Sequence, residues 1–503
     1  MKKISLFTLF FLVLSASAAF ASPAASDTTE ECLSCHAEVT PGIVADWKRS
    51  LHSRVTPEEG WKKPPLQRRV SAKGVPETLL RTVVGCAECH TLRPDTHKDT
   101  FDHNGHRVHI VVTPPDCSTC HPEETTQYSR NIMSQAYANL NANPVYHGLV
   151  EQVNGTYAFA EGKIGLSPPG DQTNADACFY CHGTVIEVSG MRERETVMGE
   201  MAFPVLSGWP NQGVGRINPD ASEGSCSSCH PRHEFSIKVA RSPATCSECH
   251  KGPDVPAYPV YLVSKHGNIY SSLGGTWNFT SVPWKIGTDF TAPTCAACHV
   301  SLLVAGDGDP QEIVAERSHQ MNDRLAWRIF GLVYAHPHPL SPDTTVIRNK
   351  AGLPLPTELT GEPASSFLID AREGRTRTAK MKKICSGCHG GNWVEGHFAR
   401  FEETIRTTNK VTQAATNILL AAWEKGVAKG LAQNDSIFNE PIEKMWVEQW
   451  LFFANSTRFA SAMAGADYGV FANGRWHLSK NIRRMHEWLD LALQRKPASG
   501  ERR

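Results

Sequence analysis

The sequence has no surplus of either charge, since 51 Lys and Arg residues balance 51 Asp and Glu residues over 503 positions. A chain that binds nucleic acid or an anionic membrane through its overall charge shows a clear excess of basic residues. That excess is absent here, although composition leaves room for local patches. We therefore expect no nucleic-acid partner.

The sequence also lacks an apolar run long enough to cross a bilayer, which takes about 20 residues. The N-terminal apolar run, Ile4 to Val13, is shorter than that and follows Lys2 and Lys3. Small residues at Ala19 to Ala21 then offer a cleavage site. This pattern is that of an export signal rather than a membrane anchor, so we expect residues 1–21 to be removed. The mature chain is then expected to have no membrane span and to be periplasmic or secreted.

Cysteine, in contrast, is plentiful and occurs in one repeated pattern. All 16 cysteines fall in eight copies of Cys-x-x-Cys-His. The cysteine pairs, in chain order, are Cys32 and Cys35, Cys86 and Cys89, Cys117 and Cys120, Cys178 and Cys181, Cys226 and Cys229, Cys246 and Cys249, Cys295 and Cys298, and Cys385 and Cys388. The histidines that follow them are His36, His90, His121, His182, His230, His250, His299 and His389.

Zinc sites and disulfides are the alternatives for such pairs, but neither needs a histidine directly after every pair. A c-type haem does need it, because the two thiols bond covalently to the porphyrin and the adjacent imidazole binds the iron. We therefore predict eight covalently bound haems. Covalent haem attachment in bacteria takes place outside the cytoplasm, which agrees with the export signal.

The chain length suggests about three domains. We place the first three motifs in an N-terminal segment, residues 22–175, and the other five in a core, residues 176–400. Residues 401–503 contain no cysteine. Eight haems in a chain of this length must supply much of the buried apolar surface. The expected fold is mainly α with much loop, a multihaem cytochrome c fold with a haem-packed core and C-terminal helices.

Three apolar stripes at helical spacing mark the C-terminal segment. They are Val411, Ala415, Ile418, Leu419 and Ala422, then Ile442, Trp446, Trp450 and Phe453, then Leu478, Ile482, Met485 and Leu489. Such stripes are typical of ordinary core packing. The helices are expected to cover the haem core or to form a subunit interface.

A family resemblance is carried by "CSSCHPRHEFSIKVARSPATCSECHKGPDVPAYPVYLVSKHG" and by "APTCAACH". With eight haem motifs in matching order, the chain resembles the hydroxylamine oxidoreductase family of octahaem cytochromes. The resemblance extends from "DWKRSLHS" to "GHFARF", and the central five-haem part also resembles the pentahaem nitrite reductases. It implies seven haems with histidine on both faces. The fourth haem, here on Cys178, Cys181 and His182, would keep one face open for nitrogen compounds.

The resemblance also implies a set of distal ligands on the second face of each iron. Of the 22 histidines, 14 lie outside the motifs, which is more than the seven or eight that distal ligation needs. The match assigns His52, His103, His147, His233, His266 and His319, with the seventh from His477 or His397. His97, His106 and His109 stay open as alternatives to His103.

The open face is where the sequence departs from the family. The family's Asp-His pair after the sixth motif is here Asp254 followed by Val255, and the position of its distal tyrosine is Leu302. Asp254 would relay protons if it is buried, or else it is a loop residue that caps a turn. A crosslinking tyrosine of the oxidising enzymes has only Tyr468 or Trp476 as weak counterparts. Hydroxylamine oxidation, which needs a distal base, is therefore not expected to be the physiological activity.

Three functions remain open. The chain would reduce small nitrogen oxides, nitrite or hydroxylamine, to ammonia, with His182 and Asp254 in the catalytic site. Alternatively it would be an electron-transfer cytochrome whose fourth haem is closed by a histidine. Hydroxylamine or hydrazine oxidation, or another oxyanion substrate, is the weakest case. A redox partner cytochrome or quinol-linked donor is implied, and the family suggests a homotrimer.

The segment "YAHPHPLSPD" between the seventh and eighth motifs looks like an insertion relative to the family. Its two histidines, His336 and His338, alternate with Pro337 and Pro339. One interpretation is a rigid surface loop with solvated histidines. The other is that one histidine enters the pocket of the fourth haem, as proton donor or as sixth ligand.

The motif count predicts the mass of the mature protein. Because every motif is complete, the mass should exceed that of the processed polypeptide by eight haem groups. Intact-protein mass spectrometry measures this directly. Any smaller number of haems would contradict the interpretation of the motifs.

Overall fold

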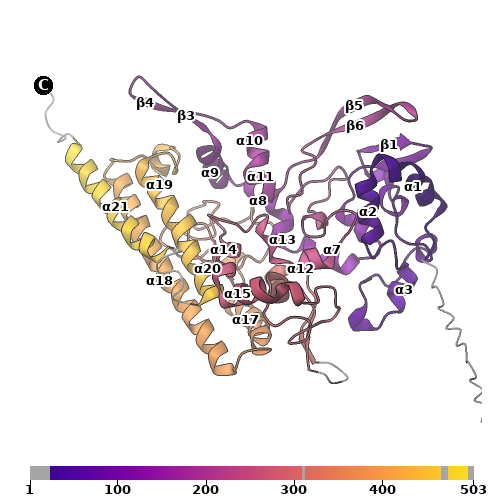
Figure 1. Ribbon diagram of the computed structural model, residues 1–503. Coiled ribbons are helices and arrows are strands. Elements are labelled where there is room, and N and C mark those ends of the chain that lie inside the picture. The colour runs from indigo at the N-terminus through magenta and orange to yellow at the C-terminus, as the bar shows by residue number, and fades with distance from the viewer. Residues whose placement is uncertain (1–22, 307, 309–311, 466–473, 497–503) are drawn as a thin grey trace, which may run out of the picture.

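The computed structural model describes residues 23–306, 308, 312–465 and 474–496. The export signal predicted at residues 1–21 lies outside them. Long helices gather on one side of the molecule, and short helices joined by loops make up the rest (Figure 1). No described helix combines the length and apolar character that crossing a membrane requires. The predicted class, mainly α with much loop, is confirmed.

The N-terminal half is built of short helices. Proline occupies the first turn of several of them, where its missing N–H costs no hydrogen bond. The helices are α1 (Asp27–Val39), α2 (Pro41–Arg49), α3 (Pro57–Lys62), α4 (Glu77–Leu80), α5 (Ala87–His90), α6 (Pro114–Cys117), α7 (Pro122–Ser129), α8 (Ala136–Asn141), α9 (Pro144–Asn154), α10 (Asp171–Asp176) and α11 (Cys178–His182).

Within the part of the chain that the structure describes, the strands form two-stranded antiparallel sheets and one three-stranded sheet of order β7-β8-β9. The hairpins β3–β4 and β5–β6 project from the same side of the molecule (Figure 1). The strands are β1 (Thr100–His103), β2 (His106–His109), β3 (Thr156–Ala160), β4 (Lys163–Ser167), β5 (Glu187–Thr196), β6 (Gly199–Ser207), β7 (Trp284–Lys285), β8 (Leu303–Ala305), β9 (Glu312–Ala315), β10 (Trp327–Arg328) and β11 (His336–Pro337).

The C-terminal helices are longer and pack on one another. The remaining helices are α12 (Ile237–Arg241), α13 (Pro243–Ser247), α14 (Ala257–Val263), α15 (Lys265–Leu273), α16 (Cys295–His299), α17 (Ala371–Ser386), α18 (Gly391–Glu424), α19 (Pro441–Val447), α20 (Asn455–Ala464) and α21 (Arg475–Arg495). Helix α18 contains no proline and runs without a break through position 400, where the sequence suggested a domain boundary. The division into segments stays a prediction.

The three predicted apolar stripes face one another in a single core. Leu419 of α18, Trp446 of α19 and Met485 of α21 are fully buried there. The indole N–H of Trp446 donates to Thr416 Oγ1 at 2.9 Å, so its polar atom is satisfied inside the core. Ordinary core packing is thus the role of these stripes, as their spacing indicated.

We predict that Leu419→Ala lowers the free energy of unfolding by about 3 kcal/mol, because it leaves a cavity in this core. The matched control is Leu491→Ala on α21, where the side chain is 52% exposed. That control should change stability by less than about 0.5 kcal/mol. Thermal unfolding followed by circular dichroism compares the two, and equal losses would contradict the core assignment.

Candidate functional site

Each Cys-x-x-Cys-His motif forms one tight turn. The histidine N–H donates to the carbonyl of the first cysteine four residues earlier, at 2.9 Å for His90 and Cys86 and at 2.9 Å for His389 and Cys385. In such a turn, residues three and four apart lie on the same face. Two thiols and one imidazole therefore point the same way, as covalent attachment to one porphyrin requires.

Several motif imidazoles are held through Nδ1. The His90 Nδ1–H donates to the carbonyl of His109 at 2.8 Å, and the His182 Nδ1–H donates to the carbonyl of Ala136 at 3.1 Å. His36 Nδ1 lies 3.0 Å from Thr40 Oγ1. A carbonyl partner fixes the proton on Nδ1, which leaves the Nε2 lone pair free for a metal.

The motifs surround one large cavity of about 2990 Å³. Ordinary ligand pockets reach only about 1,000 Å³. Seven of the eight motifs contribute lining residues, and the first motif lies outside the lining. Most of the lining surface is apolar, and the motif thiols and imidazoles are among its polar groups. The cavity therefore fits several porphyrins rather than one small molecule.

Four motif histidines face a second histidine at a uniform spacing. The ring centres are 6.0 Å apart for His36 and His103, and 6.3 Å apart for His121 and His52. The other two pairs are His230 with His319 at 6.4 Å and His389 with His266 at 6.0 Å. Two imidazoles that bind one metal ion from opposite sides have ring centres about 6 Å apart, because each metal–nitrogen bond is about 2 Å long and each ring centre lies about 1 Å behind its nitrogen. The spacing fits an iron between the rings.

Burial favours the uncharged form of several of these imidazoles. It lowers the pKa of His52, His230 and His319 to about 4, with nearby histidines adding to the effect. His103 Nδ1 and His319 Nδ1 are buried without a hydrogen-bond partner. Only a neutral imidazole can donate a lone pair to iron, so the protonation state fits the spacing.

The second motif has two histidines near it. The ring of His109 lies 6.0 Å from that of His90. The side of His90 that faces His109 is its Nδ1 side, because the Nδ1–H donates to the His109 carbonyl. His233 lies near His90 as well, and burial followed by the charge of His90 lowers the pKa of His233 to about 4. Its backbone φ of 71° is uncommon for a residue other than glycine. Both ring nitrogens of His109 contact backbone carbonyls, which leaves His233 as the candidate partner for His90.

The remaining three motif histidines are His182, His250 and His299. Within the described part of the chain, none of them has a second histidine ring at the spacing seen in the four pairs. Three further histidines line the cavity, namely His147, His338 and His397. His147 Nδ1 lies 3.5 Å from Glu151 on α9, and His397 stacks on Trp393. His477 is exposed on α21, packs against Phe453 and lies outside the lining.

Thiols of different motifs lie close together and reveal the order of the motifs in space. Burial raises the pKa of four motif thiols, and a cysteine of another motif adds a smaller contribution to each. The pairs are Cys86 with Cys32, Cys89 with Cys120, Cys229 with Cys246, and Cys298 with Cys385. Thiol hydrogen bonds join Cys117 to Cys226, Cys181 to Cys249, and Cys246 to Cys295. The motifs thus follow the path one, two, three, five, six, seven, eight, and the fourth branches from the sixth.

The surroundings of His182 combine an acidic and a basic group. Burial lowers the pKa of His182, while the carboxylate of Asp254 works against this and the charge of Arg328 works with it. Both Asp254 and Arg328 line the cavity. Asp254 is exposed, so the burial on which the predicted proton relay depended is not found. Sequence analysis identified Asp254 but missed Arg328, which belongs to no motif.

Two positions that the family fills with polar groups are apolar here. Val255 packs against the buried cluster of Val260 and Phe459, and Leu302 is buried at the cavity wall. Tyr468, one of the two crosslink counterparts, lies outside the described residues. Trp476, the other, is 60% exposed on α21.

His336 and His338 are buried, with exposed fractions of 2% and 4%. The interpretation as a solvated surface loop is therefore wrong. The reason is that β11 pairs with β10, so that the proline-flanked segment folds inward. His338 lines the cavity and its Nδ1 has no hydrogen-bond partner, whereas His336 does not reach the lining. The charge of Arg328 acts on the pKa of both His338 and His182, which places these rings near one cation.

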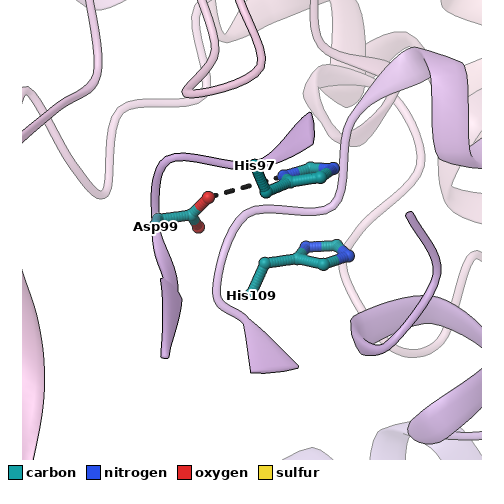
Figure 2. A group of neighbouring side chains, drawn as sticks. All are labelled: His97, Asp99 and His109. Atoms are coloured by element: carbon teal, nitrogen blue, oxygen red, sulfur yellow. Dashed lines mark ion pairs between the residues drawn. The ribbon is translucent and has the colours of Figure 1, made fainter. Parts of the chain in front are cut away.

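A separate buried cluster contains His97, Asp99 and His109 (Figure 2). The His97 ring is clamped between two carboxylates, with Nδ1 3.4 Å from Asp99 and Nε2 3.3 Å from Asp116. His109 stacks on His97 at 3.7 Å with an angle of 12° between the rings. Because the planes are nearly parallel, one ion cannot lie in both, so the cluster fits a charged imidazole better than a metal.

The other histidines considered in place of His103 already have partners at their ring nitrogens. Both ring nitrogens of His97 contact carboxylates, and those of His109 lie 3.0 Å and 3.2 Å from the carbonyls of Leu92 and Val111. His106 Nε2 binds Glu31 at 2.9 Å. Of the four candidates, His103 is the one whose ring faces His36.

Comparisons with known proteins agree with the motif turns. Residues 215–308 match the family model described as seven times multi-haem cytochrome CxxCH, and residues 116–202 match that of cytochrome c554 and c-prime. A solved structure described as a hypothetical multiheme protein is 41% identical, with a TM-score of 0.87, and the match covers 95% of this chain and 98% of that one.

Two more distant relatives come from Kuenenia stuttgartiensis. A probable nitrite reductase-hydroxylamine oxidoreductase fusion protein is 25% identical over 383 residues, which is 73% of this chain and 35% of that protein. The chain thus spans about a third of the length of that curated relative. A reducing HAO-like protein complex is similar in fold, with a TM-score of 0.60 and 17% identity over 93% of this chain and 85% of that one.

The clamped His97 predicts a pH dependence of stability. Burial acts to lower the pKa of His97, but its bonds to Asp116 and Asp99 outweigh burial and raise the pKa to about 9. Since this lies above the usual value of about 6.5, the charged ring stabilises the fold fully below that pH. The stabilisation is lost as the pH rises through about 9.

We expect His97→Gln to destabilise the protein by about 3 kcal/mol at pH 6, because two buried carboxylates lose a cation. Between pH 6.5 and 9, the thermal midpoint of the wild type should fall, and that of the variant should fall less. His106→Gln, which removes a partly exposed pair, is the control and should keep the wild-type slope. Parallel curves for His97→Gln and the wild type would contradict the assignment.

Proposed function

The chain belongs to the multihaem c-type cytochromes of the hydroxylamine oxidoreductase-like family, and from that premise we propose that it reduces nitrite or hydroxylamine to ammonia at the fourth motif. The site would be the haem held by Cys178, Cys181 and His182. Three motif histidines, His182, His250 and His299, have no paired imidazole among the described residues. The observation that carries this proposal is that His182 is the one of the three near both Asp254 and Arg328. An iron there would keep one face for substrate.

The residues around His182 suit the binding and reduction of a small anion. When bound, the haem supplies an iron that passes electrons to the nitrogen compound. Arg328 contributes a cation that attracts an anion into an apolar cavity. Asp254, which is exposed and lines the cavity, contributes a carboxylate that can pass protons from water to the substrate. The Ala136 carbonyl holds the Nδ1 proton of His182, which orients that ring.

The other motifs would conduct electrons, and eight haems in all are part of this proposal. We assign His103, His233, His52, His319 and His266 as second ligands to the irons of His36, His90, His121, His230 and His389. His147, His338 and His397 remain for His250 and His299. His397 is preferred over His477 because it lines the cavity.

The supply of electrons and the location of the protein are also proposals. A redox partner cytochrome or quinol-linked donor would supply the electrons, outside the cytoplasm. The similar fold from Kuenenia stuttgartiensis belongs to a protein complex, which makes assembly with partner chains a reasonable expectation here. A homotrimer is proposed on the family resemblance alone.

A second function is favoured by one specific residue. His338 is buried, lines the cavity, lacks a partner at Nδ1 and lies near Arg328, which also acts on His182. If His338 closed the iron of His182, the protein would be an electron relay without an open iron. Oxidation of hydroxylamine gains no support, because Val255 and Leu302 supply no base.

Electron paramagnetic resonance of the oxidised protein distinguishes the two functions. The reductase proposal predicts a high-spin iron whose signal changes on adding nitrite. His338→Ala should leave that signal in place, and His336→Ala, which does not touch the lining, serves as the matched control. Only low-spin signals, indifferent to nitrite, would overturn the reductase. A high-spin signal that appears only in His338→Ala would establish the relay.

A further inference from the structure

Helix α17 concentrates positive charge in a chain whose net charge is zero. It carries six basic residues and one acidic residue, Glu373, whereas the whole chain has 51 of each sign. The basic residues are Arg372, Arg375, Arg377, Lys380, Lys382 and Lys383. Such a local excess creates a positive potential that a net charge of zero does not reveal.

Part of this charge is neutralised and part is not. Arg377 pairs with Glu373 at 2.7 Å, and Lys382 pairs with Glu395 at 2.5 Å. Arg372 and Arg375 are exposed and have no ion pair with any described residue. The outer face of α17 is therefore available to an anionic surface.

The charged helix leads directly into the last haem motif. Cys388 of that motif is exposed, and it also lines the haem cavity. Trp393 is 45% exposed and stacks on the ring of His389, with centres 3.9 Å apart and an angle of 15° between planes. Trp393 also lines the cavity, so part of its exposed surface faces the space that the haem fills, next to the imidazole that faces His266.

The path traced by neighbouring thiols from motif to motif, called the thiol path below, ends at the eighth motif on one side and at the first motif on the other. The two ends differ in charge, because α1 carries four acidic residues and no lysine or arginine. Helices α1 and α17 lie well apart in the molecule (Figure 1). The ends of the path are therefore separated in space and opposite in sign.

We propose that the exposed face of α17 is the docking surface for an electron-transfer protein that presents an acidic face around its redox centre, and that Trp393 lies beside the haem that receives the electron. In each encounter the partner loses one electron and the iron held by His389 and His266 gains it, from ferric to ferrous. No bond forms or breaks. Complementary charge speeds such brief encounters, whose interfaces are small.

A separate protein fits this surface better than a second copy. The acidic α1 of another copy would offer four carboxylates, but Glu31 is already bound to His106. Head-to-tail contacts between identical chains also generate open filaments unless the rotation closes. The proposal depends on the assignment of haems to the motifs, and it does not depend on nitrite reduction.

The test uses the haem-loaded protein with an acidic plant-type ferredoxin as the probe. Calorimetry measures binding at low and high salt, and stopped-flow absorption measures the rate of haem reduction by the reduced probe. The variant Arg372→Glu with Arg375→Glu should weaken binding and slow reduction by about tenfold or more. The control, Lys480→Glu with Arg483→Glu on the exposed face of α21, changes the charge equally and should stay within about twofold of wild type.

A second variant separates docking from electron uptake. Trp393→Leu should bind the probe as wild type does and accept electrons more slowly. The haem absorption of every variant checks that the fold is intact. Nitrite reduction with a small dye as donor should be unchanged in the α17 variant, so a failure of the proposed function and a failure of docking are seen separately.

Three results would overturn the proposal. Equal losses in the α17 and α21 variants would mean that only net charge matters. Binding that does not respond to salt would remove the electrostatic basis. Concentration-dependent self-association in sedimentation, abolished by the α17 variant, would show that a second copy occupies this surface instead.

Discussion

The cavity that the motif turns enclose is too large for side chains to close, and this constraint governs the architecture. Protein interiors are packed about as densely as organic crystals, and each unfilled volume carries a cost. A cavity of about 2990 Å³ can persist only where large apolar groups fill it. This explains why the middle of the chain is short helices and loops, since its core is porphyrin rather than side chain. The long helices pack on one another beside it, around Leu419 and Trp446.

Burial also sets the charge state of the site. Imidazoles around the cavity, such as His52 and His230, have their pKa lowered because the charged form is poorly solvated there. His97 is buried as well, yet two carboxylates hold it charged. The same residue type is therefore kept neutral in one place and serves as a structural cation in another. What decides between them is whether carboxylates or an apolar wall face the ring.

The fourth motif differs from the others in its position as well as its surroundings. It branches from the thiol path at the sixth motif, through Cys181 and Cys249, instead of lying within it. A branch suits a site that consumes electrons, because the main path stays continuous without it. Opposite charges on α1 and α17 give the two ends of that path different surfaces, which suits partners of different charge.

The sequence by itself determined the cofactor type and the C-terminal core. Eight Cys-x-x-Cys-His motifs are local patterns, and one turn of chain is enough to bring their thiols and imidazole together. The stripes through Ala415, Trp446 and Met485 likewise follow from helical periodicity. Only the tertiary structure decided which distant histidine faces which motif, as with His36 and His103, because such pairing depends on loop paths that no local period encodes. It also turned His336 and His338 inward and brought Arg328 beside His182, since neighbours across a cavity are set by packing rather than by spacing along the chain.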